Sequence, residues 1–167
     1  MGDTFFGLKL VGKIEENFKV PSYQRGYRWR KKHVKQLLKD IYDNGDKAYC
    51  LQPIVVCKKK SECLLIDGQQ RITTIYLIYK YLNKKIPTMY KGPKFTISYD
   101  TRQASGEFLE KIESIEDTEK NEYIDFWFMK EAYDAIEEWF SSKELRAITD
   151  IGSYLETNVS VLWYEIE

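Results

Sequence analysis

Five consecutive residues, DGQQR at positions 67–71, stand between a short apolar run and a helical pattern. A strand-to-helix turn leaves the first helical N–H groups without partners, and the helix dipole adds partial positive charge there. An anion, typically a phosphate, fits that place. Gly68 lets the backbone come close to a ligand, and Arg71 can clamp two phosphate oxygens at once. The stretch therefore predicts a phosphate-binding turn.

Neighbouring side chains extend this interpretation. The amides of Gln69 and Gln70 can donate to phosphate, and Thr73 or Thr74 can add a hydroxyl. Asp67 would repel a phosphate unless a divalent cation lies between them, or unless it orients a water or a ribose hydroxyl. The residues alone are equally consistent with a capped helix start. In that case Asp67 is the N-cap and Gln70 closes a capping box.

A second polar cluster precedes the first. It alternates aromatic and basic residues: Tyr23, Gln24, Arg25, Tyr27, Arg28 and Trp29, followed by Arg30, Lys31 and Lys32. Such a pattern can stack bases and hold phosphates. It is also typical of a solvated basic edge with a buried tryptophan.

The zero net charge hides a split along the chain. Residues 1–94 hold 20 Lys and Arg against 8 Asp and Glu, and residues 95–167 hold 6 against 18. This asymmetry indicates either that the first part faces an anion, or that the two parts attract each other.

Periodicity predicts the elements that position these residues. Helices are expected over 33–45, from 68 to about 83, and over 105–112, 123–140 and 142–158, with Ser142 as an N-cap. Strands are expected over 52–59, 63–67, 94–100 and 159–166, with a hairpin turn at 59–62. Residues 1–17 read as an amphipathic lead-in, residue 18 onward as extended, and Gly26 as a turn. The order predicts an α+β fold.

Composition excludes several classes. His33 is the only histidine, so a zinc site, a His-dependent triad and an HNH nuclease site have no support. No Glu-x-Lys or Asp-x-Lys triplet occurs, so a PD-(D/E)xK nuclease site has none either. Three cysteines without a C-x-x-C pattern predict reduced thiols and a cytoplasmic protein. No apolar run suits a membrane span, and no signal peptide is evident.

The two motifs together resemble a known family. VPSYQRGYRW at residues 20–29, followed by IDGQQRITTI at residues 66–75, resembles the N-terminal domain of the GmrSD-type family. That family is similar to the ParB/sulfiredoxin-like superfamily of nucleotide-binding domains. The likeness is sharp over residues 18–76 and looser over the later helices and the final strand.

The resemblance implies a ParB/sulfiredoxin-like mixed-sheet core over residues 1–100 and a mostly helical, acidic continuation over residues 101–167. It implies that the DGQQR segment binds nucleotide phosphates and supports NTP hydrolysis with magnesium. The setting would be prokaryotic restriction and phage defence, where a separate HNH-type nuclease domain or subunit cuts the DNA. Because the chain stops just after an expected strand, we expect it to be cut from a longer protein.

Roles follow for the matched positions. Catalysis is expected from Asp67, Gln70 and Arg71, with Asp67 activating a water or holding magnesium. The residues expected to contact the nucleotide are Tyr23, Gln24, Arg25, Gly68, Gln69, Thr73 and Thr74. The residues expected to contact DNA are Arg28, Arg30, Lys31 and Lys32.

Two other functions remain open on the sequence. The chain could be a DNA-binding module without nucleotide chemistry, using the basic face of residues 19–60. It could also be a scaffold whose acidic helices dock on a nuclease subunit. Aromatic residues of the 123–140 helix that could form the docking surface are Trp127, Phe128, Trp139 and Phe140.

Overall fold

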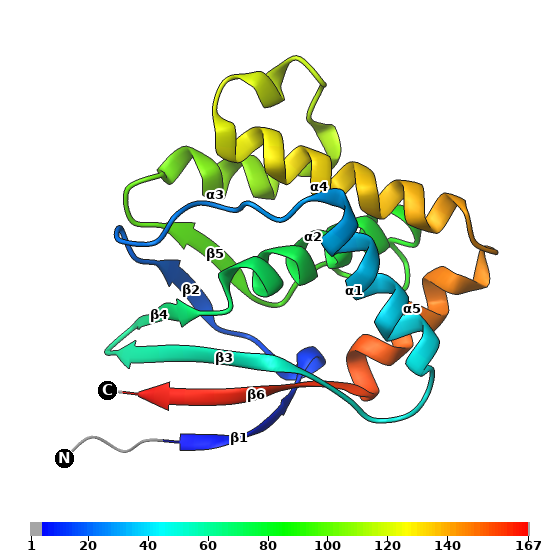
Figure 1. Ribbon diagram of the computed structural model, residues 1–167, viewed down its shortest axis with the longest axis horizontal. Helices are drawn as coiled ribbons and strands as arrows, with labels where there is room; N and C mark the ends of the chain where they lie inside the picture. The colour runs from blue at the N-terminus through cyan, green and yellow to red at the C-terminus, as the bar shows by residue number, and fades with distance from the viewer. Residues whose placement is uncertain (1–4, 167) are drawn as a thin grey trace.

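The α+β prediction is confirmed by the computed structural model, which describes residues 5–166 (Figure 1). The strands are β1 (Phe5–Leu10), β2 (Asn17–Val20), β3 (Tyr49–Lys59), β4 (Glu62–Asp67), β5 (Thr96–Tyr99) and β6 (Val159–Ile166). The α-helices are α1 (Lys31–Asn44), α2 (Gln69–Lys85), α3 (Gln103–Glu110), α4 (Ile124–Ser141) and α5 (Arg146–Thr157). Three single 3₁₀ turns are η1 (Val11–Lys13), η2 (Ile112–Ser114) and η3 (Glu119–Asn121).

All six strands form one mixed sheet in the order β1-β6-β3-β4-β2-β5. The hairpin β3–β4 is antiparallel, as is the pair β1–β6, whereas β6 runs parallel to β3 and β2 runs parallel to both β4 and β5. The last strand in the sequence therefore lies inside the sheet, between the first strand and β3. The sheet takes strands from both sides of residue 100.

Most predicted elements are confirmed, and two local expectations are wrong. The expected helix start at Ser142 fails because Ser142 is the C-cap of α4, and α5 begins after Leu145 without a side-chain cap. The segment expected only as an amphipathic lead-in contains the edge strand β1. The apolar side chains Phe5, Phe6 and Leu8 of this strand are exposed. The strand therefore has no buried face whose alternation with polar residues would have predicted it.

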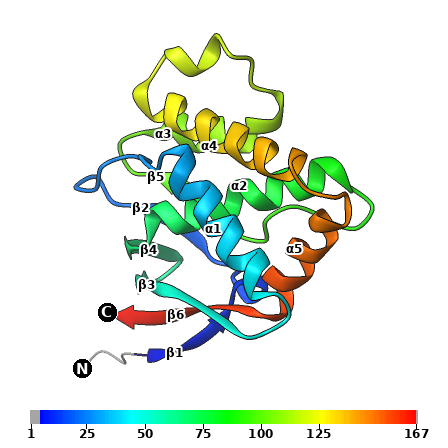
Figure 2. The same ribbon diagram turned by 45° about the vertical axis from the view of Figure 1, so that its right-hand side comes forward.

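The helices gather on one side of the sheet (Figures 1 and 2). Helix α2 lies between the sheet and α4, and it is buried on almost its whole circumference from Ile72 to Leu82. Aromatic rings fill much of this interior: Tyr81 stacks on Phe140 with centroids 4.8 Å apart, and Phe18 meets Phe95 edge-on at 5.7 Å. The high aromatic content is thus used largely for packing.

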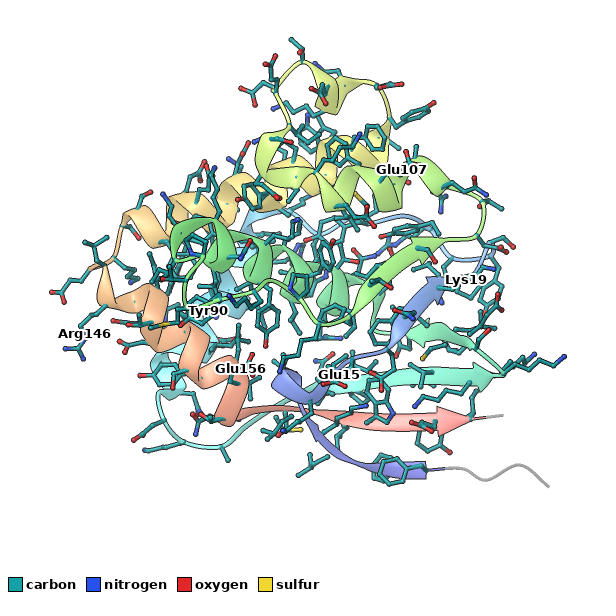
Figure 3. All side chains as sticks on the ribbon, turned by 180° about the vertical axis from the view of Figure 1, so that it is seen from behind. Glu15, Lys19, Tyr90, Glu107, Arg146 and Glu156 are labelled. Carbon is teal, nitrogen blue, oxygen red and sulfur yellow. The ribbon has the colours of Figure 1, made fainter. Side chains whose placement is uncertain are left out.

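The opposite charges of the two chain parts meet in ion pairs at the surface of the molecule. Lys31 and Lys35 on α1 contact Glu138 on α4 at 2.7 and 2.8 Å. Lys19 on β2, labelled in Figure 3, pairs with Asp100, the residue that follows β5. The Lys19 Nζ and Asp100 Oδ1 atoms are 3.6 Å apart. Exposed ion pairs contribute little stability each. The acidic helices nevertheless pack on the basic part of the chain. The charge split is therefore explained by attraction between the two parts, one of the two explanations that the sequence left open.

The connection after α2 packs against α5. Figure 3 shows Tyr90 beside that helix, close to Glu156. The Tyr90 hydroxyl donates to the Thr149 carbonyl at 3.5 Å, and Tyr79 of α2 donates to the Glu156 carboxylate at 3.0 Å. Gly152 leaves room for the Tyr90 ring, because a Cβ there would collide with it. These contacts fix α5 against α2.

Two further expectations concern redox state and membranes. Cys50, Cys57 and Cys63 are all free thiols. Burial raises the pKa of the Cys63 thiol to about 11, so it is unreactive at neutral pH. Within residues 5–166, no helix combines the length and the apolar composition that crossing a bilayer requires.

Alternation along β6 yields a stability prediction. Trp163 is 1% exposed and packs in the core against Phe18, whereas its neighbour Tyr164 lies on the other face beside the exposed Phe6 and is half-buried. We expect Trp163→Ala to lower the free energy of unfolding by about 4 kcal/mol and Tyr164→Ala by about 1 kcal/mol. Urea unfolding of both variants measures the difference. Equal losses would contradict the placement of β6 inside the sheet.

Candidate functional site

The β4–α2 junction is built around a glycine. Strand β4 ends at Asp67, and Gly68 is the N-cap of α2 with a φ of 99°, a conformation that side chains other than glycine rarely adopt. A Cβ on Gly68 would also collide with the Cδ1 atom of Ile54 on β3. Gly68 is therefore favoured by its backbone angle, and any larger residue would also need the Ile54 side chain to shift.

The first turn of α2 has no capping side chain. Asp67 Oδ1 accepts a hydrogen bond from the Gly68 N–H at 2.9 Å, and Gly68 is the N-cap, so the alternative with an N-cap at Asp67 and a capping box is wrong. The first backbone bond of the helix joins the Ile72 N–H to the Gly68 carbonyl. The N–H groups of residues 69–71 find no acceptor within the described part of the chain, so they are available to a ligand.

Three glutamines hold the 21–29 segment against this junction. Gln24 Nε2 donates to the carbonyls of Leu65 and Ile66 at 2.6 and 2.9 Å. Gln69 Nε2 donates to the Arg25 carbonyl at 2.8 Å. These amide groups tie strand β4 and helix α2 to the upstream motif, so the two motifs form one structure.

Gln70 is engaged at both ends of its amide. Its Oε1 accepts the backbone N–H groups of Arg28 and Trp29 at 2.8 and 3.2 Å, and its Nε2 donates to the Gly26 carbonyl at 3.4 Å. In this geometry Gln70 and Gln24 position the backbone. Neither amide is free for the role expected from the sequence, a nucleotide contact for Gln24 and catalysis for Gln70.

The two threonines point into the interior. Thr73 and Thr74 are both 0% exposed. Thr74 Oγ1 lies 2.8 Å from the Tyr27 hydroxyl and donates to the Gln70 carbonyl at 2.7 Å. Both threonines were expected to contact a nucleotide, but burial keeps their hydroxyls away from any ligand at the surface.

Arg71 and Arg25 are the cations of the site. Arg71 Nη2 donates to Gln52 Oε1 on β3, and its guanidinium lies 6.0 Å from the centroid of the Trp29 ring. Partial burial lowers the pKa of the Arg71 guanidinium, an effect that the charge of Asp67 partly offsets. Within residues 5–166, neither arginine is in an ion pair with a carboxylate.

These groups line one cavity. It has a volume of about 430 Å³, and its walls are Gln24, Arg25, Trp29 and residues 66–71. Seven of the expected site residues are therefore brought together: Gln24, Arg25, Asp67, Gly68, Gln69, Gln70 and Arg71. Tyr23 is exposed beside the cavity but does not line it.

Of the residues expected to contact DNA, two form ion pairs with carboxylates of this chain instead. Arg28 Nη1 donates to the buried carboxylate of Asp125 on α4 at 2.5 Å. Lys31 pairs with Glu138, and that contact raises the pKa of Lys31. Arg30 and Lys32 are exposed. The expected basic face is thus reduced, because its inner members neutralise acidic helices.

Asp125 is a residue that the sequence did not single out. Its second oxygen lies 3.1 Å from Arg102 Nε, and Arg102 Nη1 donates to the Gln24 carbonyl at 3.0 Å. A Cβ on Gly26 would overlap the Asp125 carboxylate, so Gly26 serves this close approach rather than a turn. No local pattern reveals the contact, since Asp125 lies 97 residues from Arg28.

A comparison with protein families matches the part of the chain that contains both motifs of this site. The profile of the GmrSD restriction endonuclease N-terminal domain matches residues 8–167, which include both motifs. The chain belongs to this family. GmrSD membership makes it a domain of a restriction and phage-defence protein and associates it with a nuclease domain. No curated protein matches the chain.

Gly68 gives a test of the junction. We expect Gly68→Ala to cost about 3 kcal/mol of unfolding free energy, because the positive φ and the Ile54 contact both oppose a Cβ. Gly92→Ala is the matched control, since Gly92 has a φ of 91° and open space around it. It should cost about 1 kcal/mol. Equal costs in urea unfolding would show that Ile54 does not restrict the site.

Asp125 gives a second test. Asp125→Asn keeps the side-chain volume but leaves Arg28 and Arg102 partly buried without their counter-charge. We expect a loss of about 3 kcal/mol of unfolding free energy. Asp134→Asn, which removes a more exposed partner of Lys130 on the same helix, should cost under about 1 kcal/mol. Similar values for the two variants would contradict the anchoring role of Asp125.

Proposed function

We propose that this GmrSD domain binds the phosphates of a nucleoside triphosphate in the cavity at the β4–α2 junction and hydrolyses the nucleotide. One observation carries the proposal. The Arg71 guanidinium lines the cavity beside the uncapped first turn of α2, and within the described residues it forms no ion pair with a carboxylate. An unpaired, half-buried cation next to free helix N–H groups is complementary to a phosphate.

The remaining groups fall into two kinds. Arg71, Arg25 and the backbone N–H groups of residues 69–71 are free to contact phosphate oxygens. Gln24, Gln69 and Gln70 keep those groups in place through hydrogen bonds to backbone carbonyls and N–H groups. Preorganised donors of this kind stabilise charge that develops on a transferring phosphoryl group, because they need no reorganisation during the reaction.

Asp67 is the residue that suits a magnesium ion arriving with the nucleotide. Its carboxylate is exposed, and only Oδ1 is used, by the Gly68 N–H. No cluster of three or more His, Cys, Asp or Glu side chains within residues 5–166 could hold a metal ion by itself. A single carboxylate fits magnesium, which is commonly bound through one or two carboxylates, substrate phosphates and waters. When bound, the ion would neutralise phosphate charge, and Asp67 would also accept a proton from an attacking water.

In a restriction protein, such a site would control the associated nuclease domain. NTP hydrolysis would then be the step that licenses or resets DNA cleavage. DNA binding by this domain alone is the weaker alternative, since Arg28 and Lys31 are paired with carboxylates of α4. The docking surface expected on α4 is also reduced, because Trp139 and Phe140 are buried in the core. Trp127 alone among the tryptophans of α4 stays exposed, at 39%.

Thermal-shift measurements with the four NTPs, with and without magnesium, test the proposal. We expect the wild-type protein to be stabilised by NTP with magnesium and Arg71→Ala to lose that shift, because the guanidinium supplies the main charge of the cavity. Arg146→Ala is the control, since Arg146 lies exposed on α5 and pairs only with Asp150. Its shift should equal that of the wild type.

Asp67→Ala separates binding from turnover. We expect this variant to retain a nucleotide-dependent shift without magnesium and to release no phosphate in a hydrolysis assay. Four flat traces for the wild-type protein would refute the proposal. A full shift in Arg71→Ala would refute the assignment of the site.

A further inference from the structure

A second cavity of about 430 Å³ adjoins the phosphate cavity. It lies between helix α1 and strand β3, and its walls are Trp29, His33, Gln36, Leu37, Asp40, Arg71 and residues 49–52. Trp29 and Arg71 line both cavities. A molecule whose phosphates lie at the first turn of α2 can therefore extend past Trp29 into this second space.

Aromatic rings form part of its wall. The Trp29 and His33 rings lie with centroids 5.8 Å apart, and the partly buried Tyr49 of β3 lines the same cavity. Burial and the nearby Asp40 carboxylate raise the pKa of Tyr49, so its hydroxyl stays protonated at neutral pH. Flat, half-exposed rings beside a phosphate site suit a nucleobase, which stacks on aromatic faces.

The polar groups of α1 lie in a row at this wall. His33 Nδ1 accepts the Arg30 N–H at 3.0 Å, so in the neutral ring Nε2 carries the proton and is a donor. Gln36 Nε2 donates to Asp40 Oδ1 at 2.7 Å, which leaves Gln36 Oε1 and Asp40 Oδ2 as acceptors. The helical rise puts Asp40 about 10 Å beyond His33 along the axis, at the end farther from Arg71.

We propose that the cavity between α1 and β3 holds the nucleoside half of the triphosphate and selects guanine. This inference rests on the proposed function and adds the identity of the base. Trp29 stacks against the nucleoside, and Asp40 accepts hydrogen bonds from the Watson–Crick edge of the base.

The Asp40 carboxylate discriminates between guanine and adenine, because it can only accept hydrogen bonds. An ionised carboxylate only accepts hydrogen bonds. Guanine presents two adjacent donors, N1–H and the N2 amino group, and its O6 can accept from a donor such as His33 Nε2. Adenine presents one amino group beside N1, whose lone pair repels a carboxylate. The wall therefore matches guanine and disfavours adenine.

Equilibrium binding with magnesium to the whole chain tests the inference with three probes: inorganic tripolyphosphate and non-hydrolysable analogues of GTP and ATP. We expect the GTP analogue to bind at least about tenfold more tightly than the ATP analogue, as a charged hydrogen bond provides. Asp40→Asn should remove that ratio and leave tripolyphosphate affinity within about twofold. Asp43→Asn, one turn along α1 and paired with Lys39, should keep the ratio.

A second variant keeps the test informative if Asp40→Asn does not fold. Gln36 is exposed, and Gln36→Ala should also reduce the GTP-to-ATP ratio without altering tripolyphosphate binding. Tripolyphosphate binding with equal affinities for the two analogues would overturn the guanine site and leave the phosphate site standing. No binding of any of the three probes would overturn the proposed function itself, and the base site with it.

Discussion

The site depends on a small set of amide hydrogen bonds between two segments that are distant in sequence. Gln24, Gln69 and Gln70 join the 21–29 segment to the end of β4 and the start of α2, and each uses a backbone group as its partner. Backbone groups need such partners when they are partly buried. A glutamine side chain reaches across a gap that a shorter amide would not span. The order of the loop around Arg71 therefore comes from uncharged hydrogen bonds, and Arg71 itself forms no ion pair within the described residues.

Charge is distributed in a way that supports this arrangement. The buried carboxylate of Asp125 forms ion pairs with Arg28 and Arg102. Arg102 also donates a hydrogen bond to the Gln24 carbonyl. Glu138 forms ion pairs with Lys31 and Lys35. The acidic helices thus neutralise the basic side chains on one side of the 24–35 segment. Arg25 and Arg71 form no ion pair within the described chain, so their charge is available to a ligand.

Helix α2 links the site to the core. Its first turn presents free N–H groups to the cavity, and the rest of the helix is enclosed by the sheet and α4. A helix buried on nearly all sides cannot shift without disturbing its packing, since protein interiors are close-packed. The end at the cavity is therefore held as rigidly as the core, which would suit the proposed site, because such a site must stabilise charge without reorganising.

The sequence by itself determined the strand-to-helix turn at Asp67, most helices and strands, and the family. These follow from local causes: glycine tolerates a φ of 99°, and apolar residues repeat with helical or strand periods. The sequence also placed Arg71 beside a free helix terminus. Only the tertiary structure decided that Gln70, Gln24, Thr73 and Thr74 support the backbone or the core instead of a ligand, and that Arg28 belongs to Asp125. Those outcomes depend on partners up to 97 residues away. A polar side chain has the same donors and acceptors in either role, so only the position of its partner in space separates a structural contact from a binding group.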